Sequence, residues 1–319
     1  MTSPDPRSTV TAPAPGVGRW LPWIAIASML VGLDLGLRLA ALIGPWLATT
    51  PWPAVLREPV LLYVNFVAAV LPLTLIEHWT SGTGQPRPLL RGLLFWAVAI
   101  LLAWLVTLLT REILAAIGLK PLLSLKALSD LPAPLAWLSG AGLLWLMMVT
   151  YDFFYYWFHR RQHTYGWLWR VHRAHHAIDD LSAANNYHHA LEDLLRLPVV
   201  TIPFSLLIEV QVPTLALITA FVAGWGWFIH LDSRYSLGRL GRWIGDNHYH
   251  RVHHSLRLEH HNRNYAAFFP PWDRLFGTQV LPPPDAGQLP VGLSDLPAAM
   301  RLGDYLLMPF WRNTPTPPR

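Results

Sequence analysis

Four apolar segments constrain the fold of this chain more than any other feature. They cover about residues 20–42, 60–76, 92–109 and 135–158, and each approaches the roughly 20 residues that a helix needs to cross the apolar part of a bilayer. Hydrophobic residues make up 53% of the chain and charged residues only 13%, so little amphipathic helix remains to cover four buried helices in water. The segments therefore predict an all-α integral membrane protein with about four transmembrane helices.

A fifth apolar stretch, residues 195–229, is interrupted by Glu209, Gln211 and Pro213. Two short helices that meet at this break would form a helical hairpin, entering and leaving the membrane on one side. A pair of soluble helices is the alternative. The hairpin is favoured because it brings the polar residues before and after it to the same membrane face.

Basic residues predict how the chain is oriented, because they concentrate in cytoplasmic loops. Four crossings place most arginines that flank the apolar segments on one side, the cytoplasm, and leave a few basic residues outside. The cytoplasmic group is Arg7, Arg19, Arg87, Arg91, Arg160, Arg161, Arg170 and Arg173, and the outer group is Arg111, Lys120 and Lys126. The net charge of +5 is scattered and forms no basic stripe, so no nucleic acid partner is expected.

These patterns divide the chain into four parts. Residues 1–19 are rich in Pro, Ser and Thr and predict a disordered tail. Residues 20–150 hold the transmembrane helices, and residues 151–280 form a cytoplasmic helical cap that contains most histidines. Residues 281–319 are a Pro-rich tail, in which only 302–311 could form a short interfacial helix.

Three histidine clusters indicate the chemistry. One has the spacing HxxxH and two have HxxHH: His159 and His163; His172, His175 and His176; His250, His253 and His254. Residues three and four apart share a helix face, so each cluster directs its imidazoles one way. Imidazole is the commonest metal-binding side chain. Eight of them exceed what one four-coordinate ion can use, so the clusters predict a site for two metal ions.

Further candidates lie between the clusters. His189 and His230 flank the hairpin and could each add a ligand; a hydrogen-bonded interfacial histidine is the alternative. Glu192, Asp232 and Asp246 could orient the metal-bound imidazoles, or be solvated acids. A role outside the metal site is favoured for His78, His188, His248, His260 and His261.

Several reactions are compatible with such a site. The chain has no cysteine, which excludes thiolate metal sites and a cysteine nucleophile. Two iron ions could activate dioxygen against the C–H bonds of a lipid in the bilayer. A zinc-dependent lipid hydrolase or lyase is the alternative, although no His-Glu-x-x-His motif is present. A metal transporter is less favoured. Transport across the membrane needs ionisable residues inside the membrane-spanning helices, and here most ionisable residues follow the apolar segments.

The motifs resemble those of the fatty acid hydroxylase/sterol desaturase superfamily of membrane di-iron oxidoreductases. The resemblance covers roughly residues 152–278 and rests on FHRRQH (158–163), LWRVHRAHH (168–176), HRVHHS (250–255), NY (264–265) and WDRLFGT (272–278). His189-Ala-Leu-Glu192 resembles the family motif HPLE, and His230 resembles the histidine before the third cluster. Ala190, Asp232 and Ala266 replace the family's Pro, Asn and Gly. These changes remove no ligand, so they put in question the substrate subgroup to which the chain belongs and not the chemistry of the site.

The resemblance implies ten metal ligands and no other catalytic or cofactor-binding residue. They are His159, His163, His172, His175, His176, His189, His230, His250, His253 and His254. It implies two iron ions, with zinc as a possible substitute, and hydroxylation or desaturation of a fatty acyl chain or sterol-like substrate in lipid biosynthesis. No flavin or nicotinamide fingerprint is visible, so electrons are expected from a separate carrier, a ferredoxin or cytochrome b5-like protein, with its reductase.

Overall fold

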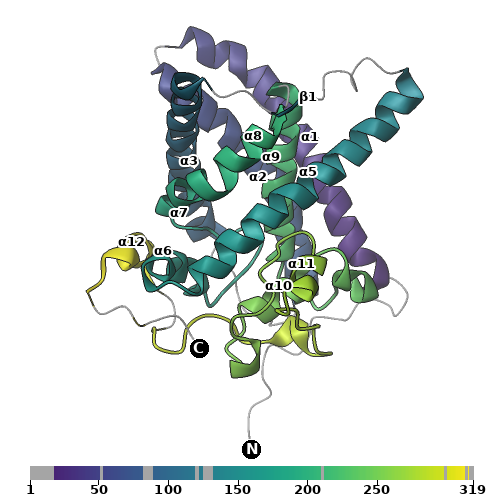
Figure 1. Ribbon diagram of the computed structural model, residues 1–319, viewed down its shortest axis with the longest axis vertical. Coiled ribbons are helices and arrows are strands. Elements are labelled where there is room, and N and C mark those ends of the chain that lie inside the picture. The colour runs from purple at the N-terminus through teal and green to yellow at the C-terminus, as the bar shows by residue number, and fades with distance from the viewer. Residues whose placement is uncertain are drawn as a thin grey trace, which may run out of the picture.

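The structure is a computed structural model of the chain, drawn in Figure 1. It describes residues 18–50, 53–81, 89–118, 122–124, 132–209, 212–297, 300–312 and 315. Nearly all of the predicted N-terminal tail (1–19) lies outside these residues, as do four of the basic residues used to orient the chain: Arg7, Arg87, Lys120 and Lys126.

Three long helices form the apolar part of the molecule. They are α1 (Leu21–Thr49), which follows a single turn, η1 (Gly18–Trp20), and then α2 (Ala54–Thr80) and α3 (Leu89–Ile117). Within the described residues, three stretches are long and apolar enough to cross a membrane: Gly18–Thr49, Val55–Thr80 and Leu89–Leu109. Large hydrophobic side chains lie exposed along them. The prediction of a helical membrane protein is confirmed.

The helices α1 and α2 pack closely because α1 has glycine where they meet. A Cβ atom on Gly32 would lie 2.5 Å from the carbonyl oxygen of Ala68 and 2.7 Å from the Cα of Ala69. Any larger residue would therefore push the backbones apart. Small residues at such contacts are typical of helices packed in membranes, where dispersion rather than the hydrophobic effect holds helices together.

The fourth expected span lies in α5 (Ala133–Gln162), which crosses the molecule diagonally in Figure 1. The described side chains of this helix are those of residues 142–162, and they include no stretch that qualifies by length and composition. The number of crossings therefore stays a prediction. The C-terminal end of α5 carries the first histidine cluster.

The expected helical hairpin is present, and it breaks where the sequence indicated. It consists of α7 (Ala190–Arg196), a wide turn η2 (Leu197–Thr201), α8 (Ile202–Leu207) and α9 (Val212–Ile229). Between α8 and α9, the two-residue strand β2 (Ile208–Glu209) pairs in parallel with β1 (Leu123–Ser124), with Leu123 opposite Ile208. Apart from this pairing, the described elements are helical.

Short elements gather at one end of the long helices and hold the histidines (Figure 1). The helices are α6 (Gly166–His176), α10 (Asn247–His253), α11 (Pro271–Leu275) and α12 (Leu302–Leu307). The single turns are η3 (Gly238–Arg242), η4 (Leu258–His260), η5 (Ala286–Gln288) and η6 (Met308–Phe310). We call this end of the molecule, the described residues of 159–196 and 230–312, the polar half.

Residues of the predicted C-terminal tail pack against the polar half. The short helix expected at 302–311 appears as α12 and η6. Tyr305 and Met308 are fully buried, and the Tyr305 ring meets the Tyr187 ring edge-on at 5.3 Å. Asp295 forms an ion pair with the buried guanidinium of Arg173 in α6. These contacts hold the segment against the helix that carries the second histidine cluster.

Candidate metal centre

Buried aspartates fix the backbone that carries the first and third histidine clusters. The carboxylate of Asp152 in α5 accepts hydrogen bonds from the amides of Ala267, Phe268 and Phe269, at 3.0, 3.0 and 2.7 Å. Asp246 caps α10 by accepting from the amide of Tyr249 at 2.9 Å. These bonds tie α5 to the chain beyond α10, and they hold the backbone segments that carry the two clusters against each other.

The polar half brings nine of the ten predicted ligands into two sets. The first set is His159, His163, His172, His176 and His253, and the second set is His175, His230, His250 and His254. Within each set, the candidate ligand nitrogens all lie within 4.8 Å of one another. All nine side chains are buried. The second cluster divides between the sets: His172 and His176 turn to one, and His175 turns to the other.

Two nitrogens of the second set face each other in a way that hydrogen bonding cannot explain. Nδ1 of His175 lies 3.2 Å from the carbonyl oxygen of Tyr187, and Nδ1 of His230 lies 2.6 Å from that of Gly226. A carbonyl only accepts, so both Nδ1 atoms carry the proton. A neutral imidazole has one N–H, so each Nε2 presents a lone pair. These two Nε2 atoms are 3.2 Å apart.

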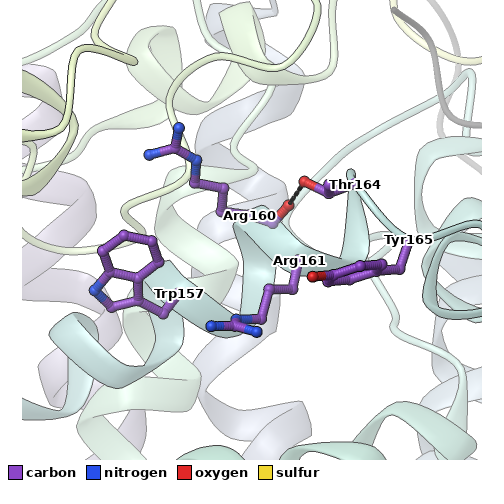
Figure 2. Close-up of a pocket in the computed structure, with 5 residues that line it drawn as sticks. All are labelled: Trp157, Arg160, Arg161, Thr164 and Tyr165. Atoms are coloured by element: carbon purple, nitrogen blue, oxygen red, sulfur yellow. Dashed lines mark hydrogen bonds between the residues drawn. The ribbon is translucent and has the colours of Figure 1, made fainter.

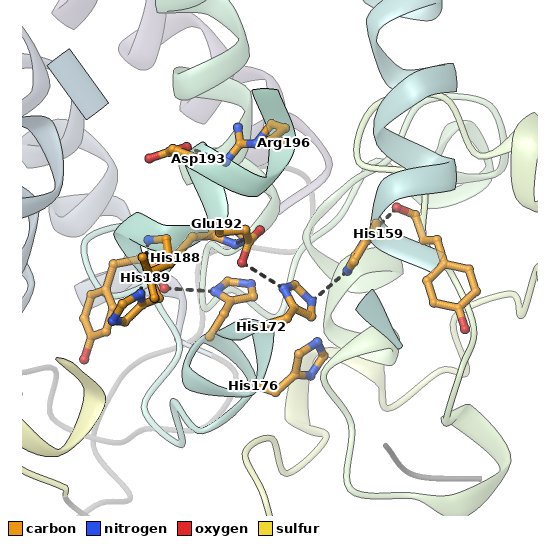
Figure 3. Close-up of polar contacts among 12 residues, drawn as sticks. His159, His172, His176, His188, His189, Glu192, Asp193 and Arg196 are labelled. Atoms are coloured by element: carbon orange, nitrogen blue, oxygen red, sulfur yellow. Dashed lines mark hydrogen bonds and ion pairs between the residues drawn. The ribbon is translucent and has the colours of Figure 1, made fainter. Parts of the chain in front are cut away.

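The first set has the same arrangement, part of which is visible in Figure 3. Nδ1 of His159 donates to the carbonyl oxygen of Tyr265 at 2.7 Å, and Nδ1 of His172 lies 3.1 Å from Oε2 of Glu192. Their Nε2 atoms, which must again carry lone pairs, are 3.0 Å apart. Two lone pairs at this separation repel each other, and a cation between them turns the repulsion into attraction.

The histidines are neutral, as metal ligands must be. Burial lowers the pKa of His230 and of His253 to about 3. Burial, reinforced by neighbouring imidazoles, also lowers the pKa of His163, His175 and His254 well below the ordinary value. A proton on these rings therefore does not relieve the repulsion between lone pairs at neutral pH.

The spacing of the nitrogens fits a metal ion. Other Nε2 pairs are 2.9 Å apart for His250 and His230, and 3.1 Å apart for His253 and His176. Two nitrogens that each lie about 2.1 Å from one ion, at right angles, are about 3.0 Å apart. Both nitrogens of His163 are buried without a hydrogen-bond partner in the described structure. A buried polar atom normally has a partner, and an ion would supply one here.

His189, the tenth predicted ligand, is placed apart from both sets. Its Nδ1 accepts a hydrogen bond from the amide of Leu191 at 3.1 Å, which caps the N-terminus of α7. Its Nε2 lies 3.1 Å from the carbonyl oxygen of Leu306 in α12. Both nitrogens therefore bond to the backbone, and the structure gives His189 a capping role that joins the hairpin to the C-terminal segment.

His188, which the sequence left outside the metal site, lies against it. Its ring stacks on the ring of His175, with centroids 3.8 Å apart and planes 18° apart. Its Nδ1 lies 2.8 Å from Oε1 of Glu192. His172, His188 and Glu192 form a third group of potential ligand atoms. The four-residue spacing between His188 and Glu192 could have indicated this contact, but the likeness of residues 189–192 to HPLE drew attention to His189.

Of the three acids expected to orient ligands, Glu192 contacts a histidine of the two sets. Asp232 instead pairs with Arg251 at 3.2 Å, and Asp246 caps α10. Both therefore support the frame around the site. The other unassigned histidines, His78, His248, His260 and His261, belong to neither set.

A separate open pocket of about 250 Å³ lies at the C-terminal end of α5 (Figure 2). It is lined by Trp157, Arg160, Arg161, Thr164 and Tyr165. The Arg160 guanidinium lies 5.6 Å from the centre of the Trp157 ring. No predicted ligand lines this pocket. Its aromatic and basic side chains are of the kind that anchor a protein where the membrane meets water.

Comparison with known proteins agrees with the geometry. Residues 144–278, which contain both histidine sets, match the fatty acid hydroxylase family. Over 140 residues the chain is 29% identical to an alkylglycerol monooxygenase from Danio rerio. This alignment covers 44% of the chain and 31% of that protein, so the chain spans about a third of the relative's length. No solved structure gives a significant match. The resemblance found in the motifs is confirmed.

Proposed function

We propose that this chain, whose residues 144–278 match the fatty acid hydroxylase family, is a membrane-bound lipid monooxygenase that uses two iron ions and dioxygen. The observation that carries the proposal is the pair of facing Nε2 atoms in each histidine set, 3.0 and 3.2 Å apart. Both sets require a cation for the same electrostatic reason. Two cations side by side are compatible with oxidation and with metal-assisted hydrolysis, and the residues around them decide between the two reactions.

Iron is favoured over zinc because the described residues around the histidine sets offer no free general base. Hydrolysis by zinc needs a general base beside a metal-bound water, and Glu192 is already committed to His172 and His188. Imidazole suits iron as well as zinc. Two iron ions, when bound, would supply the reduction of dioxygen and the oxidation of a C–H bond. The protein residues hold the ions, exclude water and position the lipid chain.

The surroundings of the site favour a hydrocarbon substrate. The helices α1, α2 and α3 expose leucine, valine and tryptophan side chains along their length, so a lipid can approach the polar half from the bilayer. We propose that the protein crosses the membrane several times, with the histidine sets facing the cytoplasm. Electrons would reach the site there from a separate carrier, a ferredoxin or cytochrome b5-like protein.

Hydroxylation is favoured over desaturation, because the matching family and the similar zebrafish protein are both named for the insertion of oxygen. The name of that relative makes an alkylglycerol, a glycerol ether lipid, the first substrate to test. Fatty acyl chains and sterols follow, since all three offer the same unactivated C–H bonds.

The test is to express the full chain in a lipid-rich host and to analyse its lipids by mass spectrometry. The His172→Ala variant is the matched control, because it removes one ligand of the first set. We expect lipids heavier by one oxygen atom with the intact protein and not with the variant. A loss of two hydrogens instead would identify a desaturase.

Metal analysis of the purified protein separates the proposal from its rival. We expect two iron ions per chain and dioxygen uptake when a reductant and lipid are added. Two zinc ions per chain, no dioxygen uptake and release of a cleaved lipid would favour the zinc-dependent hydrolase or lyase and overturn the proposal.

A further inference from the structure

We propose that Glu192 and His188 act as one positioning unit that holds a histidine of each set in place, His172 for the first and His175 for the second. The inference rests on the proposed two-metal site and goes beyond it, because neither residue would bind an ion itself. Glu192 sets the orientation of His172 through one carboxylate oxygen. His188, beside the other oxygen, supports His175 through its ring face.

The carboxylate of Glu192 is placed to serve two histidines at once (Figure 3). Its side chain is fully buried, with Oε2 3.1 Å from Nδ1 of His172 and Oε1 2.8 Å from Nδ1 of His188. An ionised carboxylate only accepts hydrogen bonds, so His172 must carry its proton on Nδ1. Its Nε2 lone pair then points to Nε2 of His159, 3.0 Å away. Glu192 therefore determines which nitrogen His172 offers to an ion.

His188 restricts the orientation of His175, a histidine of the second set. Its ring lies flat on the ring of His175, with centroids 3.8 Å apart. Nδ1 of His175 already donates to the carbonyl oxygen of Tyr187, so the remaining freedom of the ring is to tilt. The stacked ring of His188 blocks that tilt on one face. His175 is thereby held with its Nε2 3.2 Å from Nε2 of His230.

Glu192 also brings a negative charge next to the proposed site for two cations. It reaches the site from α7, at the start of the hairpin, whereas His172 and His175 belong to α6. Among the described residues, it is the one carboxylate that the groups of potential ligand atoms include. It therefore offsets positive charge in the interior as well as orienting a ring.

The experiment measures metal binding in the purified full chain, loaded with cobalt(II) as the probe. Carboxylates that orient metal-bound histidines contribute about 10- to 100-fold to metal affinity. We expect Glu192→Gln, which keeps the shape and removes the charge, to release cobalt to a chelator about 10- to 100-fold faster. We also expect a changed cobalt absorption spectrum, because the charge-assisted hydrogen bond that orients His172 is replaced by a weaker neutral one.

Two variants of His188 distinguish the effect of its stacked ring from the effect of its ring nitrogens. His188→Ala removes the ring, and we expect weaker binding of one of the two ions and a changed spectrum. His188→Phe restores an aromatic face against His175, and we expect it to recover part of the lost affinity. Because His188 is partly exposed, neither variant should prevent folding, unlike a truncation of the fully buried Glu192.

Asp193→Asn is the matched control. Asp193 is the next residue in α7, and its carboxylate pairs with Arg196 at 2.7 Å and is in neither histidine set. We expect cobalt binding to be unchanged in this variant. The thermal unfolding of every variant without metal is compared with that of the intact chain, so that a loss of fold is not mistaken for a loss of binding.

The possible outcomes separate this inference from the proposed function. If the intact chain binds two cobalt ions and Glu192→Gln has the same spectrum and release rate, the positioning unit is wrong and the two-metal site stands. If the intact chain binds no cobalt, the proposed function fails first. If His188→Phe is as weak as His188→Ala, the stacking role of His188 is overturned.

Discussion

The membrane helices and the polar half differ in the kind of side chain that they expose and bury. In α1, large apolar side chains such as Val31 and Leu42 are 69% and 75% exposed. In the polar half, ionisable side chains such as His172, Glu192 and Asp273 are fully buried. The first region relies on lipid as its solvent and on close backbone packing. The second depends on hydrogen bonds and charge, so every buried polar atom there needs a partner. Substitutions should therefore act differently in the two regions.

The largest contrast is expected between His172→Ala and Val31→Ala. His172 supplies a lone pair to the first set, so its loss should reduce oxygenation of lipid by at least about 100-fold, since even residues behind metal ligands contribute that much. Val31 is exposed and in no set, and its truncation should leave the rate unchanged. Product formation by mass spectrometry measures both. Equal activity of the two variants would refute the assigned role of the first set.

Removing the metal should destabilise the polar half strongly. An ion at 100 to 1,000 times its dissociation constant stabilises a fold by about 3–4 kcal/mol, and chelation removes this and exposes the repulsion between lone pairs. We expect a lower thermal unfolding temperature after chelation, measured in detergent or nanodiscs. The His172→Ala variant should show a smaller decrease. An unfolding temperature that chelation does not change would show that the sets hold no ion.

The histidine sets were largely predictable from the sequence, because spacing on a helix decides which rings share a face. The division of the HxxHH cluster, with His175 turned away from His172 and His176, was not. Nor was the bond between His189 and α12, since its partner Leu306 is 117 positions further along the chain. Sequence spacing carries information about local geometry but not about which distant segment arrives beside a given ring.

Asp152→Ala should have the next largest effect, because the carboxylate joins α5 to the segment after α10. The change removes three hydrogen bonds to the amides of residues 267–269 and leaves those amides without partners. We expect a loss of about 3 kcal/mol in the free energy of unfolding. Thr150→Val, two residues away, removes only an exposed bond to the carbonyl of Leu146 and should change the unfolding temperature little. Similar effects from both would contradict this role.

The framework around Asp152 could not be predicted from the sequence. In the sequence, Asp152 is a single aspartate near the end of the fourth apolar segment, and nothing local indicates its partners. In the structure it is fully buried and bonded to a segment more than a hundred residues away. The fold class, the hairpin and its break were predictable, because they follow from local hydropathy and proline.

The smallest expected effect lies in the membrane helices and is steric. Gly32→Val places side-chain atoms where the Ala68 carbonyl and the Ala69 Cα lie, so α1 and α2 must separate. Overpacking of this kind costs about 1–3 kcal/mol. Gly142→Ala is the control, because its added Cβ meets nothing within 4 Å. Thermal unfolding compares them, and metal content should stay normal in both. Loss of metal in Gly32→Val would show that the two regions are coupled more tightly than their contacts indicate.

The hairpin also dictates when during biosynthesis the centre can be completed. His172 precedes the hairpin, His230 follows it, and His250, His253 and His254 come last. Under the proposed function, a nascent chain cannot retain both ions until translation has passed α8, α9 and α10. On the same premise, a ribosome-bound intermediate that stops after α6 would display the open, unligated imidazoles of the first two clusters to any metal ion that it meets.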